Sequence, residues 1–186
     1  MAHRVCPWWL GYFLASPLRR WMGQDALHIL SPYVHEGMTV LEPGPGMGFF
    51  TIPLARLVGP TGRVVAVDLQ PKMIASLKRR AQKANLASRI DARVTSAGTL
   101  GVDDLAGQVD LTLAFAVVHE LPDTGSFFRE VAQASKPGAQ VLLAEPSGHV
   151  DEKSFAAELE AASAAGFALT SRPEITRSRG AIFTRG

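Results

Sequence analysis

The stretch Val40-Leu41-Glu42-Pro43-Gly44-Pro45-Gly46-Met47-Gly48 decides the fold of this 186-residue chain. The short apolar run at residues 39–42 predicts a β-strand. The three glycines after it predict a tight turn whose backbone can approach a ligand closely, because glycine has no Cβ atom in the way. A helical pattern follows at residues 54–58. This order of strand, glycine turn and helix is typical of the ligand-binding edge of a parallel sheet.

Strand and helix patterns alternate along the rest of the chain, which indicates an α/β protein with a parallel sheet. The run at residues 109–116 is almost unbroken in its apolar character, as expected of a central strand buried on both faces. Lys136-Pro137-Gly138 predicts a stop and a turn before the fifth strand. The other expected strands are 63–68, 90–94, 139–144, 167–171 and 181–184, and the expected later helices are 71–85, 127–135 and 152–165.

Glu42 and the glycine spacing distinguish this site from a dinucleotide site, and Asp68 adds a contact for a ribose. Glu42 stands two positions before the first glycine, where it would repel a pyrophosphate and attract a cationic amine. The glycines are spaced G-x-G-x-G rather than G-x-G-x-x-G, which also disfavours NAD. Asp68 ends the second strand, where a carboxylate can accept hydrogen bonds from the hydroxyls of a ribose. Together these features predict a nucleoside cofactor with a cationic end.

The glycine loop, the strand that ends at Asp68, the run 110–115 and the Lys136-Pro137-Gly138 turn resemble class I S-adenosylmethionine-dependent methyltransferases. The resemblance covers the chain from about Met38 to its end. It implies a doubly wound, mostly parallel seven-stranded sheet of order 3-2-1-4-5-7-6, with strand 7 antiparallel and helices on both faces. The length of the chain separately predicts one domain over residues 1–186, with a core over 37–186.

The resemblance implies S-adenosyl-L-methionine as cofactor and S-adenosyl-L-homocysteine as product. Many relatives place an acidic residue after the third strand to contact the adenine, whereas this chain has Ser96 there, so backbone groups of Ala97 are expected to serve instead. The expected cofactor-binding residues are Glu42, Gly44, Pro45, Gly46, Gly48, Asp68, Leu69, Ser96, Ala97, Phe115 and Ala116.

Candidate residues for chemistry follow the fourth and fifth strands. His119 is the candidate general base by its location, and a structural role in the loop carries equal weight because histidine commonly serves in both. Glu145 and His149 follow the fifth strand and are candidate substrate contacts, with ordinary polar loop residues as the alternative. Their spacing matches no metal-binding motif, so no metal is expected.

The segment at residues 1–36 is densely aromatic, and we expect it to cover the acceptor site as a lid, with Trp8, Trp9 and Tyr12 contacting the substrate. The alternatives are a staple on the core, a homodimer contact and an interfacial membrane anchor. Cys6 is expected to be buried and unreactive rather than a reactive thiol.

Composition excludes several classes of protein. The formal net charge is only +2, so no global field indicates nucleic-acid binding. A single cysteine excludes an intramolecular disulfide and suits a reducing compartment. The apolar run near the N-terminus imitates a signal peptide, but Pro7 and Arg19-Arg20 argue against one, and the run is too short to span a bilayer. A cytoplasmic location is expected.

The leading functional hypothesis is methyl transfer by in-line displacement to a small-molecule acceptor, with no nucleic-acid partner. A nucleic-acid or protein methyltransferase is the alternative, although the fourth strand lacks the Asn or Asp followed by Pro-Pro and an aromatic residue seen in amino-methylating relatives. A nicotinamide dehydrogenase is disfavoured by Glu42 and by the glycine spacing. A non-catalytic module that binds the nucleoside cofactor is the remaining alternative.

Overall fold

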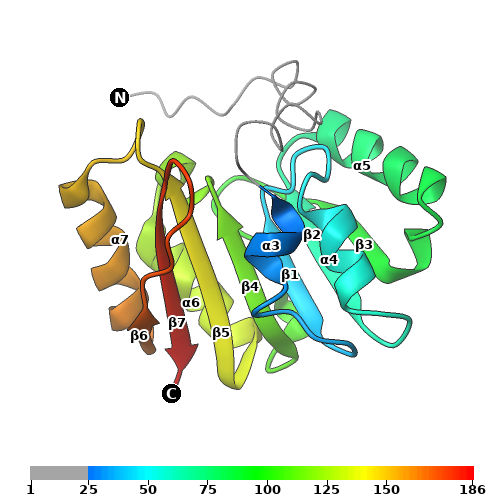
Figure 1. Cartoon of the computed structure of the whole chain (residues 1–186). Coiled ribbons are helices and arrows are strands. Elements are labelled where there is room, and N and C mark those ends of the chain that lie inside the picture. The colour runs from blue at the N-terminus through cyan, green and yellow to red at the C-terminus, as the bar shows by residue number, and fades with distance from the viewer. Residues whose placement is uncertain (1–24) are drawn as a thin grey trace. The chain divides into compact units, whose positions relative to one another are not determined.

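The computed structural model describes residues 25–186 (Figure 1). Seven strands form one sheet in the order β3-β2-β1-β4-β5-β7-β6. Strand β7 is antiparallel to both of its neighbours. The predicted strand order and the predicted antiparallel strand are therefore confirmed. The described residues fall into two compact units, an N-terminal unit that ends at Thr95 and a C-terminal unit of residues Ser96–Gly186, and each is described by itself.

The N-terminal unit contains three parallel strands, β1 (Thr39–Pro43), β2 (Arg63–Asp68) and β3 (Ile90–Val94). Residues 64–67 of β2 are fully or almost fully buried, as expected of an apolar strand that is covered on both faces. The register pairs Glu42 with Ala66 and Asp68 with Val94. The strand pairing thus sets the positions of both predicted acidic residues within one unit.

Three α-helices belong to this unit: α3 (Ala26–Leu30), α4 (Thr51–Leu57) and α5 (Pro71–Lys83). Helix α5 begins at a proline, whose missing N–H is not needed in the first turn. It packs on β2 and β3 and buries Ile74 and Leu77 against Ala66 and Ala92. The helix was expected to reach residue 85, but Asn85 has a left-handed φ of 57°, which ends the helix earlier.

The C-terminal unit contains the parallel pair β4 (Val109–Phe115) and β5 (Ser135–Pro146), followed by β6 (Phe167–Ser171) and β7 (Ser178–Arg185). Its helices are α6 (Thr124–Ala134) and α7 (Glu152–Ala164), with short 3₁₀ turns η2 (Asp103–Leu105) and η3 (Val118–Glu120). The first unit holds a further 3₁₀ turn, η1 (Ala87–Arg89). Figure 1 shows α7 beside β6 and β7, in the orange to red colours of the C-terminal end of the chain.

Two sequence expectations differ from the structure in this unit. Helix α6 begins three residues earlier than expected because the Asp123 carboxylate accepts the backbone N–H of Ser126 and caps the helix. The tripeptide Lys136-Pro137-Gly138 was expected to form a turn before the strand, but it lies within β5. There Gly138 has a φ of +76° where the pairing with β4 shifts register, so the chain bends without leaving the sheet.

No helix among residues 25–186 is long and apolar enough to cross a bilayer.

Candidate active site

The glycine loop lies between β1 and α4, as predicted. Gly44, Gly46 and Gly48 have positive φ angles of 65°, 55° and 87°. The N–H of Gly48 donates to the Pro45 carbonyl at 2.9 Å, which closes a four-residue turn. A Cβ atom on Gly48 would lie 2.5 Å from Cδ1 of the buried Leu77, so a side chain at this position would force Leu77 to move. A Cβ atom on Gly46 would meet no atom within 4 Å, so the backbone there borders open space that a ligand can approach.

Glu42 at the end of β1 carries a buried carboxyl group. Its residue is only 3% exposed, and among residues 25–186 its Oε2 atom has no hydrogen-bond partner. Burial raises the pKa of Glu42 to about 8, the nearby Thr51 hydroxyl lowers it in part, and the charge of Asp68 raises it further. An unpartnered buried carboxyl is a site that a cationic ligand group would satisfy. This observation fits the amino-acid end of S-adenosylmethionine.

Asp68 at the end of β2 is oriented by the backbone of two loops. Its carboxylate accepts the N–H of Gln70 at 2.8 Å and also the N–H of Gly46. Burial nevertheless raises the pKa of Asp68 above its ordinary value, and the two backbone donors lower it in part. The neighbouring Leu69 is exposed to 38% and presents an apolar surface. The N-terminal unit therefore brings Glu42, the glycine loop and Asp68 together, as predicted from the sequence.

The remaining predicted cofactor residues belong to the C-terminal unit. Ser96 and Ala97 are exposed in the loop after β3. Phe115 ends β4 and is buried, and Ala116 follows it with a φ of +55°. A left-handed conformation is uncommon for a residue with a side chain, and such strain is often found at functional sites. Ala116 donates its N–H to the Ala144 carbonyl at 2.7 Å, so the bend is held on β5.

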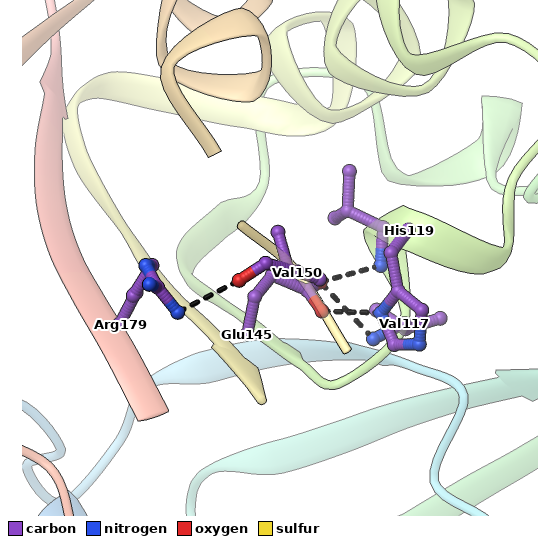
Figure 2. Close-up of polar contacts among 6 residues, drawn as sticks. Val117, His119, Glu145, Val150 and Arg179 are labelled. Carbon is purple, nitrogen blue, oxygen red and sulfur yellow. Dashed lines mark hydrogen bonds and ion pairs between the residues drawn. The ribbon is translucent and has the colours of Figure 1, made fainter. Parts of the chain in front are cut away.

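His119 in η3 is hydrogen-bonded through Nδ1 to Oε2 of Glu145 (Figure 2). The other carboxylate oxygen of Glu145 accepts the N–H groups of Val118 at 2.8 Å and Val117 at 3.3 Å. Glu145 is fully buried, whereas 24% of the His119 side chain is exposed. The bond to Glu145 raises the pKa of His119, and partial burial of the ring opposes that effect. Glu145 was predicted from the sequence as a candidate substrate contact, and in the structure both of its carboxylate oxygens bind protein donors.

Glu158 on α7 is a member of this cluster that the sequence analysis missed. It is 6% exposed, and its Oε2 atom has no hydrogen-bond partner among the described residues. Burial raises the pKa of Glu158 to about 8, the charge of Glu145 raises it further, and His119 lowers it. The available signal was periodicity, because Glu158 stands between Phe155 and Ala162 on the buried stripe of α7. A carboxyl group on an apolar stripe is a candidate functional residue.

His149 lies beside His119, with their ring centroids 6.3 Å apart. Arg179 on β7 holds the loop that carries His149, because its Nη1 donates to the Val150 carbonyl at 2.7 Å (Figure 2). Arg179 also donates to the Ser147 carbonyl at 3.1 Å through the same Nη1. Its Nε also donates to Glu152 at 2.8 Å. No local sequence pattern distinguishes Arg179 from the other arginines near the C-terminus. Among residues 25–186 no three His, Cys, Asp or Glu side chains are placed to hold a metal ion.

Trp8, Trp9, Tyr12 and Cys6 lie outside the described residues, so the predicted lid and dimer contact stay predictions.

The strand order and the glycine loop are those of the class I S-adenosylmethionine-dependent methyltransferase fold. The methyltransferase domain family matches residues 34–175, and the chain belongs to that family. S-adenosylmethionine is the cofactor that this membership implies. The fold is similar to that of a SAM-dependent methyltransferase from Aquifex aeolicus, with a TM-score of 0.84 and 23% identity over 97% of this chain and 99% of that one.

Curated relatives are similar over part of their length. An arsenite methyltransferase from Halobacterium salinarum is 32% identical over 59% of this chain and 27% of its own length. A ubiquinone biosynthesis O-methyltransferase from Methylocella silvestris is 33% identical over 61% of this chain and 42% of its own. A ribosomal protein L11 methyltransferase from Pelotomaculum thermopropionicum is 33% identical over 80% of this chain and 44% of its own. The chain thus spans less than half the length of these relatives.

Proposed function

We propose that this chain transfers a methyl group from S-adenosylmethionine to a hydroxyl group of a small-molecule acceptor. The observation that carries the proposal is the His119–Glu145 pair, in which a buried carboxylate orients a partly exposed imidazole. A base held in this way is required when the acceptor has to lose a proton. The family membership supports methyl transfer, and the choice of acceptor rests on this pair.

Each residue proposed to hold the cofactor is assigned to the part of the cofactor that its side chain suits chemically. When bound, S-adenosylmethionine supplies a methyl group on a sulfonium, and S-adenosylhomocysteine is left as the product. Glu42 is proposed to bind the cationic amine, and Asp68 the ribose hydroxyls. The exposed side chain of Leu69 offers an apolar surface for the adenine. The other proposed contacts are Gly44, Pro45, Gly46, Gly48, Ser96, Ala97, Phe115 and Ala116.

His119 is proposed to receive the proton of the acceptor hydroxyl at Nε2. In the neutral imidazole, Nδ1 donates to Glu145, so Nε2 keeps its lone pair. As the acceptor oxygen gains its methyl group, its proton passes to Nε2, and Glu145 stabilises the imidazolium that forms. Glu145 acts here as a positioning residue, since both of its oxygens are already occupied by protein donors. His149 is the proposed substrate contact from the neighbouring loop.

A neutral hydroxyl acceptor fits this cluster better than the alternatives. A trivalent metalloid reacts through its own lone pair and needs no base, so the pair would have no purpose there. An anionic acceptor would be repelled by the buried carboxylate of Glu145. The relatives named for O-methylation in ubiquinone biosynthesis support the same choice. The single cysteine, which excludes an intramolecular disulfide and suits a reducing compartment, supports a cytoplasmic location.

Calorimetric titration with S-adenosylmethionine, S-adenosylhomocysteine and NAD tests the cofactor assignment. Both sulfur nucleosides should bind in about the micromolar range, and NAD should not. Asp68→Ala should abolish binding, whereas Asp103→Ala, an exposed acidic residue, should not. Binding of NAD alone, or of no ligand, would refute the proposal.

An acceptor panel then tests the substrate class by mass spectrometry. The panel contains phenols and catechols, arsenite, a peptide mixture and RNA. Methylated phenol or catechol is the expected product. Methylation of arsenite, peptide or RNA in its place would overturn the hydroxyl assignment while leaving the cofactor assignment intact.

A further inference from the structure

A charged contact joins helix α5 to the glycine loop. Nη1 of Arg80 donates to the backbone carbonyl of Met47 at 2.6 Å, across 33 residues of sequence. The guanidinium is partly buried, and burial lowers the pKa of Arg80 from its high ordinary value without removing its charge at neutral pH. A hydrogen bond from an ionised donor is stronger than one between neutral groups, and removal from water strengthens it further.

The Met47 carbonyl belongs to the peptide unit that closes the loop's turn. In this unit the carbonyl of Met47 binds Arg80, and the N–H of Gly48 binds the Pro45 carbonyl at 2.9 Å. Both polar groups of one planar peptide are therefore held, and a planar peptide held at both ends cannot rotate. The turn that it closes has Gly46, the residue that borders open space, as one of its two central residues.

The same helix also holds the loop sterically. Leu77 lies one turn before Arg80 on α5, and its Cδ1 fills the space that a side chain at Gly48 would need. Leu77 is fully buried in the core against β2 and β3. The loop is thus set by two adjacent points on one helix: an apolar contact at Gly48 and a charged hydrogen bond at Met47.

We propose that Arg80 is a positioning residue for cofactor binding, which fixes the Met47–Gly48 peptide so that the loop backbone is ordered before the cofactor arrives. The inference rests on the proposed function, in which this loop holds S-adenosylmethionine. Without Arg80, the ordering of the loop would have to occur on binding, and the affinity would fall by that amount. Arg80 touches the loop and acts on the cofactor through it.

The test compares Arg80→Met with Arg79→Met. Arg79 is the preceding residue on the same helix, is exposed, and loses the same charge on substitution. Methionine preserves most of the aliphatic length of Arg80 and removes the donor. We expect Arg80→Met to bind S-adenosylhomocysteine at least about tenfold more weakly than wild type, Arg79→Met to bind within about twofold, and Arg80→Lys to recover part of the loss.

Hydrogen exchange of the backbone amides of residues 46–48 in the ligand-free protein gives a second readout. It should accelerate in Arg80→Met and remain unchanged in Arg79→Met. Equal affinity and equal exchange rates in Arg80→Met and Arg79→Met would overturn the inference. If Arg80→Met does not fold, Arg80→Lys takes its place in this comparison. If wild type fails to bind S-adenosylhomocysteine, the proposed function fails and the inference about binding fails with it. If wild type binds and the two methionine variants match, the inference alone fails.

Discussion

Nδ1 of His119 and Oε2 of Glu145 form a hydrogen bond between the turn that follows β4 and the end of β5, 26 residues apart in the chain. The fully buried carboxylate is held in place by two backbone N–H groups, so the imidazole is fixed by a group that itself has little freedom. This arrangement selects one tautomer and directs Nε2 away from the carboxylate. The first two predictions follow from this pair.

Replacing His119 with Asn should lower kcat by about 10²- to 10⁴-fold, the contribution typical of a positioned general base. Affinity for S-adenosylhomocysteine should stay within about twofold, because the residue is not proposed to hold the cofactor. His35→Asn, at an exposed position in the other unit, is the matched control. Unchanged turnover in His119→Asn would assign the histidine to the structural role that the sequence left open.

Replacing Glu145 with Gln should shift the pH dependence of turnover. The bond to Glu145 raises the pKa of His119, and the base works only when deprotonated, that is, above that pKa. Removing the negative charge lowers the pKa of His119, so the acidic limb of the kcat/KM profile should move to lower pH while the maximal rate falls. If the acidic limb stays at the same pH and only the maximal kcat/KM falls, Glu145 does not set the pKa of His119.

The pH dependence of cofactor affinity tests Glu42. The pKa of Glu42 is raised to about 8 in the free protein, and a cationic ligand favours the ionised carboxylate. Affinity for S-adenosylmethionine should therefore rise with pH between about pH 5.5 and 6.5, at least about one pH unit below the ordinary α-amino pKa. Titration in buffers of different ionisation enthalpy should detect the released proton. In Glu42→Gln both the slope and the proton release should vanish, with weaker binding throughout.

The raised pKa of Glu158 predicts that the stability of the folded protein depends on pH. Its pKa is about 8 in the folded protein against an ordinary value of 4.5, so the folded state binds more protons between these values. The free energy of unfolding should therefore fall as pH rises through this window. Glu158→Gln should show a smaller fall in Tm between about pH 5 and 9 than wild type. Glu160→Gln, an exposed residue on the same helix, should behave like wild type, and identical pH dependence in all three proteins would refute the prediction.

Steric exclusion at Gly48 can be separated from backbone strain. Gly48 and Gly98 have nearly equal φ angles of 87° and 86°, but only at Gly48 would a Cβ atom meet a neighbour, the buried Leu77. Gly98→Ala should cost about 1 kcal/mol of unfolding free energy from strain alone. Gly48→Ala should cost about 1–3 kcal/mol more and weaken cofactor binding. Denaturant unfolding and calorimetry measure the two effects, and equal losses in both variants would remove the steric argument.

Local sequence patterns were enough to predict the strands, the glycine loop and the positions of Glu42 and Asp68. The apolar run of β2, the glycine spacing and the positions of Glu42 and Asp68 relative to their strands depend on neighbours in sequence. The strand order came from the resemblance that these residues carry, and the structure confirms it. The predicted helix ends were less accurate than the predicted strands. A helix end depends on a single capping residue such as Asp123 or a single left-handed residue such as Asn85.

Only the tertiary structure decided which distant side chains meet. Glu145 was predicted at the end of its strand as a candidate substrate contact, and only the structure shows that its carboxylate is hydrogen-bonded to His119. Glu158 lies near the charges of Glu145 and His119, and Arg80 reaches the Met47 carbonyl, because α7 and α5 turn these residues inward. A periodicity shows which face of a helix is buried but not what lies opposite that face. The sequence by itself determined the fold class and the cofactor loop, because both arise from short-range chemistry. Long-range packing determined the pairing of charges, because that depends on how separate elements come together.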